Sequence, residues 1–418
     1  MEYLTQAAVT AVPYTASPVR LLWSDIRLIL QNIWTLPGIF LPLRLGRTSP
    51  LDELFVSLPN GATVALHGFL VVYQLAFLVS LPIVLLLMMP ALWILTYVAG
   101  FFSVNYLICI LLNGRRRIIT SQVPVTETPG HERECWFFIN GVAVGRRWLQ
   151  QNINQLSYTF GRKVTGVHNR TSGIIFDLLE CLIQRDLSYA TDDVRSTYEL
   201  LKKALLNPNC DKVVLLLHSQ GAIEGGLIID WLLDELPRDL LRSLEVYTFA
   251  AAANHFNNPW TSCPKPSESP TTDPSGAMSN TIRHIEHYAN DGDFVARWGL
   301  LHFIDVPNRY MGQVFIRSDS GHMMNQHYLD NMFTLGPDQK VLDSNPFMET
   351  TIATQPNKTM REQDGAQGKR ADGKPSTSGV LGRQSPEPNG SSQTLRIKNV
   401  SRLWQYRNGG SPGTREGA

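Results

Sequence analysis

The pattern of hydrophobic and polar positions changes near residue 117. Before it, residues 68–112 carry no charged side chain. One membrane crossing needs about 20 apolar residues, and this run is about twice that length. Pro82 and Pro90 lie near its middle, where a missing backbone donor makes a bend easiest. The pattern predicts a helical hairpin, either as two full crossings or as a turn within one leaflet; a buried helix pair of a soluble protein is the alternative.

Arginines flank this hydrophobic segment on both sides. Arg44 and Arg47 precede it, and Arg115, Arg116 and Arg117 follow it. Because basic residues favour the cytosolic side, both ends of the hairpin are expected there, on the endoplasmic reticulum or a lipid droplet. Four sequons favour a lumenal face instead, although such short motifs arise by chance: Asn169, Asn357, Asn389 and Asn399.

The N-terminal segment 1–67 contains one amphipathic pattern. Ser17 and Pro18 are typical of a helix start. Apolar residues then recur at three- and four-residue steps: Val19, Leu22, Trp23, Ile26, Leu30 and Ile33. This pattern predicts a helix that lies either in the membrane interface or against the folded domain.

Beyond Arg117, short apolar runs alternate with helical patterns. We expect strands at 135–140, 163–168, 212–217, 244–253, 282–290 and 313–317, with helices at 145–160, 174–185, 191–205 and 222–236. This alternation predicts an α/β domain over residues 118–344, a mostly parallel sheet with helices on both faces. In such sheets, the functional residues gather just past the carboxyl ends of the strands.

The most continuous strand pattern runs directly into Ser219. In "VVLLLHSQG", five apolar residues precede His218, Ser219 and Gln220, and a helix follows. A serine hydroxyl becomes a nucleophile only with a base, a group that orients the base, and donors for the oxyanion. Later strands end at suitable partners: Asp291 or Asp293, and His322 or His327.

Ser, then an acid, then His, on a strand–turn–helix, resembles the α/β-hydrolase superfamily and especially its lipase-like members. The resemblance covers residues 133–335, and the chain is similar to uncharacterised membrane-anchored hydrolase-like proteins of fungi. It implies a catalytic triad of Ser219, Asp293 and His322. It also implies an oxyanion hole at Gly141, Val142 and Gln220.

Several positions leave alternatives open. The elbow pattern of the family has a small residue two positions before the serine, where this chain has Leu217. "NDGDFV" resembles a lipase pattern that selects Asp293, while Asp291 is typical of turn chemistry. His322 lies in a loop and His327 falls in the next predicted helix, which favours His322. His168, Asn169 and Thr171 either line the pocket or form a turn.

The expected activity is ester hydrolysis at a membrane, with a lipid or other ester as substrate. An acyltransferase on the same fold and a catalytically silent membrane scaffold are the alternatives. No cofactor is implied, and the net charge of +1 gives no indication of nucleic-acid binding. The five cysteines show no metal spacing, and no further ligand accompanies His322 and His327, so no metal is expected.

Two segments lack the pattern of a core element. Residues 254–280 are rich in Pro, Ser and Thr, which predicts a surface insertion and a candidate lid. Residues 345–418 are polar and rich in Gly, Pro and Ser, which predicts a disordered tail.

Overall fold

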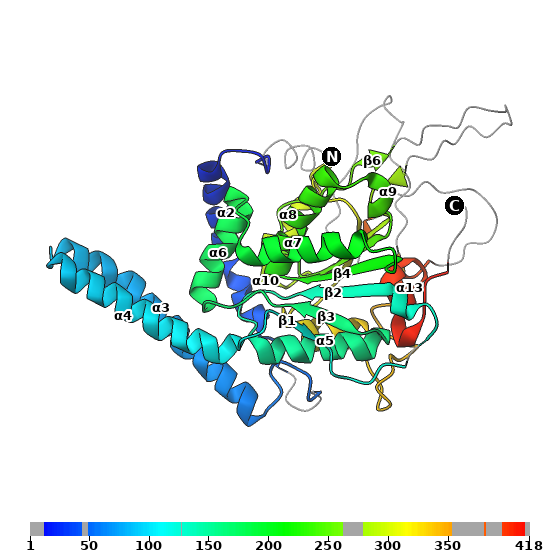
Figure 1. The fold of residues 1–418 in the computed structure, drawn as a ribbon, viewed down its shortest axis with the longest axis horizontal. Helices are drawn as coiled ribbons and strands as arrows, with labels where there is room; N and C mark the ends of the chain where they lie inside the picture. Colours follow the sequence, from blue (N-terminus) through cyan, green and yellow to red (C-terminus); the bar gives the residue numbers. More distant parts are fainter. Residues whose placement is uncertain are drawn as a thin grey trace, which may run out of the picture.

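The computed structural model describes residues 12–43, 49–126, 128–261, 279–352, 380–381 and 395–413. An α/β domain is preceded by a hairpin of two long apolar helices, α3 (Leu58–Leu86) and α4 (Ala91–Asn113), which projects from one end of the domain (Figure 1). Each is long and apolar enough to cross a membrane, and only 17% of its most hydrophobic window is buried. These helices therefore differ from core helices of a soluble protein, whose apolar residues are covered.

The hairpin begins ten residues earlier than the uncharged run. Ser57 accepts a hydrogen bond from the Asn60 amide at the start of α3, and Pro59 occupies its first turn. The part of α3 up to Phe77 packs on the domain, in part through polar contacts. Gln74, for example, donates to the carbonyl of Ser172 at 2.7 Å. The predicted bend is present, with α3 ending at Leu86 and α4 starting after Pro90.

The domain is built on one mixed sheet in the order β1-β3-β2-β4-β5-β8-β9-β10. Strands β3, β2, β4, β5, β8 and β9 are parallel, and β1 and β10 add antiparallel edges. The strands are β1 (Ile118–Thr120), β2 (Glu134–Ile139), β3 (Val164–Val167), β4 (Lys212–His218), β5 (Leu244–Phe249), β8 (His284–Asn290), β9 (Gln313–Arg317) and β10 (Val380–Leu381). The predicted mostly parallel α/β fold is confirmed.

Helices cover both faces of this sheet (Figure 1). On one face lie α6 (Ile174–Leu187), α7 (Asp192–Leu205), α8 (Gln220–Glu235) and α10 (Phe294–Trp298); on the other lie α5 (Arg146–Phe160), the π-helix η3 (Met324–Leu329), α12 (Asp330–Met332), α13 (Ile397–Val400) and α14 (Arg402–Gln405). The remaining short elements are η2 (His131–Arg133), α9 (Arg238–Leu241), β6 (Trp260–Thr261), β7 (Ser279–Asn280), α11 (Leu300–Phe303) and η4 (Arg407–Gly409).

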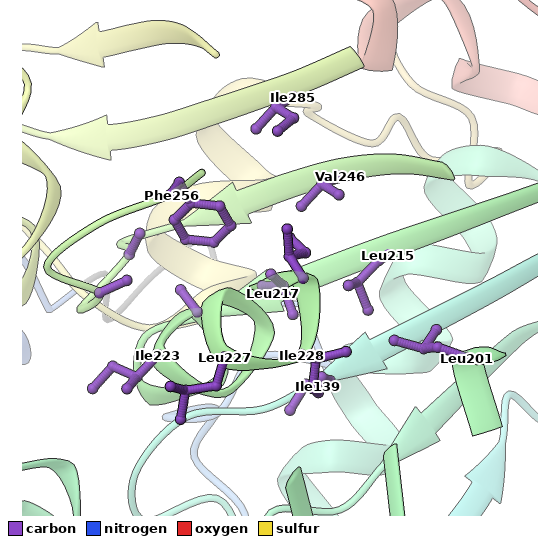
Figure 2. Close-up of a cluster of buried hydrophobic side chains, with 14 of the residues drawn as sticks. Ile139, Leu201, Leu215, Leu217, Ile223, Leu227, Ile228, Val246, Phe256 and Ile285 are labelled. Carbon is purple, nitrogen blue, oxygen red and sulfur yellow. The ribbon is translucent and has the colours of Figure 1, made fainter. Parts of the chain in front are cut away.

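The alternation of side chains along β4 explains its continuous apolar run. Leu215 and Leu217 point into the core beneath α8, where they meet Ile228 and Val246 (Figure 2). Val214 and Leu216 point to the opposite core, beneath α5. Because both faces of a central parallel strand are buried, no polar position interrupts it until His218.

The predicted N-terminal helix forms as α2 (Pro18–Asn32), followed by the 3₁₀-helix η1 (Ile33–Ile39). Ser17 stands at the N-cap position, but its side chain makes no capping hydrogen bond. The predicted apolar stripe is not the packed face, since Leu21, Asp25 and Leu28 are buried while Trp23 is exposed. The helix packs against the domain and leaves much of its stripe uncovered.

Two predicted boundaries are wrong. The surface insertion was expected from residue 254, yet Asn254, Phe256 and Asn258 are buried in the domain. Residues 262–278, which make up most of the candidate lid, lie outside the described residues. Nor is the whole tail without structure. Trp404 and Tyr406 are buried against the α5 face of the sheet, where their large apolar rings join the core.

Candidate active site

Ser219 occupies a sharp turn between β4 and α8. Its φ of 56° and ψ of −120° lie outside the regions that residues with side chains usually adopt. The surroundings hold this conformation, since the Ser219 amide donates to the Phe249 carbonyl and its own carbonyl accepts from Ala222 and Ala252. The turn places the serine at the carboxyl edge of the sheet and at the N-terminus of a 16-residue helix.

The imidazole of His322 bridges Ser219 and Asp293. Its Nε2 lies 2.9 Å from Ser219 Oγ, and its Nδ1 lies 2.9 Å from Asp293 Oδ2 and 3.1 Å from Oδ1. With Nδ1 donating to the carboxylate, Nε2 is left as the acceptor for the serine hydroxyl. The three side chains come from loops after β4, β8 and β9, so the parallel sheet brings together residues that are 103 apart in sequence.

Asp293 is fully buried and has two further donors. The Val295 amide donates to Oδ1 at 2.9 Å, and the Tyr328 hydroxyl donates to Oδ2 at 2.8 Å. Tyr328 also accepts from the Asn290 amide. Burial and the charge of Asp293 raise the pKa of the Tyr328 phenol well above its ordinary value, so it stays a donor. The sequence analysis missed Tyr328, which the π-helical turn of η3 directs at a carboxylate 35 residues earlier.

Asp291 and His327, the alternatives to Asp293 and His322, make other contacts. The backbone of Asp291 pairs with Arg317, and its carbonyl accepts from Arg297. His327 is fully buried, its Nδ1 accepts from the Met323 amide, and its Nε2 lies 3.2 Å from the Pro42 carbonyl. Of the acids and histidines singled out after these strands, the structure brings Asp293 and His322 to Ser219.

The loop after β2 lies against the serine. A Cβ atom on Gly141 would lie 2.4 Å from Ser219 Cβ and 3.0 Å from Oγ, so only glycine permits this approach. Asn140 holds the loop, because its amide donates to the Asn169 carbonyl and its Oδ1 accepts from the Asn169 N–H. Gly141, one of the predicted site residues, therefore lies beside the hydroxyl, and Val142 follows it directly.

Residues of the loop after β3 hold the loop after β2, which carries Gly141, in place. His168 Nε2 donates to the Val144 carbonyl at 2.9 Å, and burial lowers the pKa of His168 to about 4. Thr171 donates to Asp177 at 2.6 Å, and Asp177 also accepts from the Ala143 amide. His168, Asn169 and Thr171 therefore stabilise the loop that carries Gly141. His168 and Asn169 contact this loop directly, and Thr171 acts through Asp177.

The start of α8 supplies backbone N–H groups next to the serine. Gln220 opens α8, and the first amides of a helix have no partner within the helix. Its side chain turns away, with Nε2 donating to Gln184 Oε1 at 3.1 Å. Gln220 therefore follows Ser219 directly at the start of α8, and Gly141 packs against Ser219 from the loop after β2.

His218 stabilises the loop that carries the imidazole. Its Nε2 donates to the backbone carbonyl of His322 at 2.9 Å. Burial, and secondarily the neighbouring His322, keep the pKa of His218 well below its ordinary value, so it remains neutral. The strand residue before Ser219 thus fixes the backbone of His322.

The site is closed by the N-terminal segment. Ser219 is only 2% exposed. The Ile39 carbonyl, at the end of η1, accepts from the His322 amide at 3.2 Å, and the Leu41 carbonyl accepts from Ser320. Sequence patterns gave no signal for this contact, because nearly 300 residues separate its two sides.

A buried ion pair ties α2 to the domain. Arg185 on α6 donates to Asp25 at 3.0 Å and also to the carbonyls of Ala252 and Trp298. Its guanidinium lies 4.0 Å from the centre of the Trp298 ring. Since breaking a buried pair leaves an uncompensated charge, this contact fixes α2 beside α6 and α10.

Within the described residues, no group of three or more His, Cys, Asp and Glu side chains is arranged to hold a metal ion. The chain matches no protein-family model and no curated protein.

Proposed function

We propose that this protein is a membrane-anchored serine hydrolase of the α/β-hydrolase, lipase-like type, which cleaves esters through an acyl-enzyme intermediate. The observation that carries the proposal is the continuous hydrogen-bonded relay from Ser219 Oγ through His322 to Asp293, with Ser219 on a strained strand–helix turn. Strain of this kind is found where the surrounding structure maintains a functional geometry. A plain N-cap serine needs neither the strain nor the relay.

The chemistry follows from these positions. Ser219 Oγ attacks the ester carbonyl carbon while His322 Nε2 takes the hydroxyl proton. Asp293 stabilises the resulting imidazolium and keeps Nδ1 protonated. The N–H groups of Gln220 and the Gly141–Val142 loop are the donors for the tetrahedral oxyanion.

The intermediate then collapses. The bond between the carbonyl carbon and the alkoxy oxygen breaks, and the leaving alcohol takes the proton from His322. Water attacks the acyl-serine with His322 again as base, and the acid product leaves with Ser219 Oγ reprotonated. Ser219, His322, Asp293, the backbone donors and one water molecule are sufficient for the whole reaction.

A lipid ester is the substrate class that the location favours. The α3–α4 hairpin exposes apolar side chains along its length, and the segment that closes the site is also apolar on its outer side, with Trp34 65% exposed. A substrate dissolved in the membrane would reach the site without crossing water.

Turnover by matched variants tests the proposal. The purified full-length chain in detergent is given a short-chain glycerol ester, and released acid is titrated. We expect Ser219→Ala to lose several orders of magnitude in kcat, because triad residues act as a unit. Exposed Ser196→Ala serves as the control. Equal rates for wild type and Ser219→Ala would refute the proposal, and an added alcohol that becomes acylated in place of water would identify a transferase.

We further propose that the catalytic domain faces the cytosol, on the endoplasmic reticulum or a lipid droplet. The basic residues Arg115–Arg117 at the end of α4 support this orientation. Protease treatment of sealed microsomes tests it with tags at both termini. Digestion of both tags without detergent is expected, and protection of either one would contradict the topology.

A further inference from the structure

The outer face of α6 is apolar, although this helix lies on the surface of the domain. All of its exposed positions carry apolar side chains: Leu178, Leu179, Ile183 and Leu187. Its charged side chains are instead buried or half-buried: Asp177, Glu180, Arg185 and Asp186. A surface helix of a soluble protein has the opposite arrangement, with its polar side toward the solvent.

Contacts within the domain fix the orientation of α6. Arg185 donates to Asp25 on α2 at 3.0 Å, and Asp177 accepts from the Thr171 hydroxyl at 2.6 Å. Because these buried contacts hold the polar side of the helix inward, its apolar side stays outward. Exposed apolar side chains that gather on one surface are typical of a contact with a protein or a membrane.

This apolar surface continues across α2, which packs beside α6 at the end of the domain from which the hairpin projects (Figure 1). Helix α2 and the following η1 expose six large apolar side chains: Val19, Trp23, Leu30, Ile33, Trp34 and Leu36. Together with the exposed side chains of α6, they form the α2–α6 face.

The exposed charges of the α2–α6 face are basic. Within residues 18–39 and 174–187, all of which the structure describes, the exposed charged side chains are Arg20 and Arg27. The Arg27 guanidinium lies 5.2 Å from the centre of the Trp23 ring. Tryptophan and arginine beside an apolar surface are typical of helices in the head-group region of anionic membranes. A second copy of the chain fits less well, since a symmetric contact would bring the same arginines together.

The length of the hairpin also places the membrane at this face. Buried side chains on the hairpin end at Phe77 on α3 and resume at Phe101 on α4. Residues 78–86 of α3 therefore extend only about 14 Å, half of the roughly 30 Å hydrocarbon of a bilayer. The ring of Phe176, in the first turn of α6, lies 5.9 Å from that of Phe101. Insertion of this short segment therefore brings α6 to the membrane surface.

Polar side chains in residues 78–100, the hairpin tip, have partners within the hairpin. Ser80 Oγ donates to the Ala76 carbonyl at 2.6 Å and lies 2.5 Å from the Tyr97 hydroxyl. Thr96 donates to the Leu92 carbonyl at 2.8 Å. Because hydrocarbon offers no hydrogen-bond partners, such a tip is suited to it.

We propose that the α2–α6 face lies in the head-group region of an anionic membrane, while the hairpin tip enters the adjoining leaflet. This inference rests on the membrane attachment proposed above, and it adds the surface of the domain that meets the lipid. Trp23 and Trp34 lie at the boundary between head groups and acyl chains, and Arg20 and Arg27 contact lipid phosphates.

The orientation has a consequence for the proposed catalytic centre. The Ile39 carbonyl, at the end of η1, accepts from the His322 amide. The segment that covers the proposed base therefore lies at the lipid surface, on the side from which a lipid ester arrives.

Quenching of tryptophan fluorescence by brominated phospholipids tests the proposal. The full-length Ser219→Ala protein is reconstituted into liposomes of phosphatidylcholine and phosphatidylserine, with bromine on the acyl chains either near the head group or near the chain end. Trp23→Phe/Trp34→Phe is expected to remove about half or more of the quenching by shallow bromine, because tryptophan rings prefer this depth. Trp260→Phe, at an exposed position on β6, is the control and is expected to change nothing.

Trp93, exposed near the start of α4, reports the hairpin tip separately. Trp93→Phe is expected to remove quenching by deep bromine. If Trp93 is quenched and Trp23 and Trp34 are not, the α2–α6 face is overturned while the attachment through the hairpin stands. If none of the three is quenched, the proposed attachment fails as well.

The contribution of α6 has its own variant. Leu179→Glu/Ile183→Glu is expected to lower the quenching of Trp23 by shallow bromine without changing the melting temperature in detergent, because both side chains are exposed. Leu206→Glu/Leu342→Glu, at exposed leucines outside the face, is the matched control and is expected to quench as the parent does. Equal losses in the two double variants would overturn the role of α6.

The basic residues are tested by lipid composition. Phosphatidylserine is expected to increase shallow quenching, and Arg20→Gln/Arg27→Gln to reduce that gain, because each basic side chain favours an anionic surface about fivefold. Quenching that is independent of phosphatidylserine would overturn the anionic membrane as the partner. An unquenched Trp23 together with chemical crosslinks between the α2 helices of two copies would assign the face to a dimer instead.

Discussion

Leu217 packs against Gly225 across the turn that carries Ser219. A Cβ atom on Gly225 would lie 2.3 Å from Leu217 Cδ1, so the missing side chain on α8 provides the space that Leu217 fills. The large residue two positions before the serine departs from the usual elbow pattern. The pair explains how the turn tolerates it, because a small residue on the helix replaces the small residue on the strand.

This relationship predicts a compensating pair. Gly225→Ala is expected to destabilise the fold by about 1–3 kcal/mol and to lower activity, because the added methyl group displaces Leu217 and the end of β4. Leu217→Ala/Gly225→Ala is expected to cost less than the sum of the single changes, with a coupling of about 0.5–3 kcal/mol. Denaturant unfolding of all four proteins measures it. Additive costs would show that the two side chains do not interact.

The two histidines after β9 are predicted to have separable effects. His322→Ala is expected to reduce kcat as severely as Ser219→Ala, since it removes the group bonded to the hydroxyl. His327→Ala is expected to lower the melting temperature and to keep most of the kcat of the protein that remains folded, because it is buried without contacting Ser219. An active His322→Ala protein with an inactive, folded His327→Ala protein would reverse the assignment.

Tyr328→Phe is predicted to weaken catalysis without abolishing it. The change removes the donor to Asp293 Oδ2, and a hydrogen bond to a charged group contributes about 1.5–3 kcal/mol. We expect kcat to fall about tenfold or more with little change in KM, because Tyr328 contacts Asp293 and is itself fully buried. Steady-state kinetics measures the two constants. Tyr406→Phe, which removes a buried hydroxyl bonded to Glu245, is the matched control and is expected to retain kcat.

A buried carboxyl on α8 predicts a pH dependence of stability. Glu224 is fully buried, and both charged groups that act on it, Glu180 on α6 and Asp193 on α7, are acidic. Burial, and then these charges, raise its pKa well above the ordinary value. The folded protein therefore keeps a proton that the unfolded chain releases above pH of about 4.5, so this stabilising contribution is present at low pH and is lost as pH rises.

Glu224→Gln is accordingly expected to stabilise the protein increasingly between pH 5 and 8, by up to about 1.4 kcal/mol per pH unit. Thermal unfolding of wild type and variant across this range measures the difference. Glu199→Gln, at an exposed position of α7, is the control and is expected to leave the pH dependence unchanged. A difference between wild type and Glu224→Gln that stays constant with pH would contradict the raised pKa.

The parts of the fold that depend on local pattern were predictable. The uninterrupted run before His218 identified the central strand, and the uncharged run up to Leu112 identified the hairpin. Ser219, Asp293 and His322 could be selected because a parallel sheet places the ends of its strands at one edge. Their 2.9 Å contacts follow from that topology.

Contacts between distant segments were not predictable from such patterns. Nothing in the local sequence links Tyr328 to Asp293, or Ile39 to His322, because each pair depends on how loops fold in three dimensions. Trp404 and Tyr406 were placed in a disordered tail because their apolar side chains follow a long polar stretch, yet they complete the core beside α5. Composition averaged over a long segment conceals a short packed one.

Covalent labelling tests the central claim most directly. A fluorophosphonate loses fluoride when a serine oxygen attacks phosphorus, with the proton passing to the adjacent base, so the adduct marks the activated hydroxyl. Peptide mass spectrometry of the labelled full-length protein is predicted to find the adduct on Ser219, and His322→Ala is predicted to prevent it. The absence of an adduct on the folded wild-type protein, or an adduct on another serine that persists in Ser219→Ala, would contradict the account.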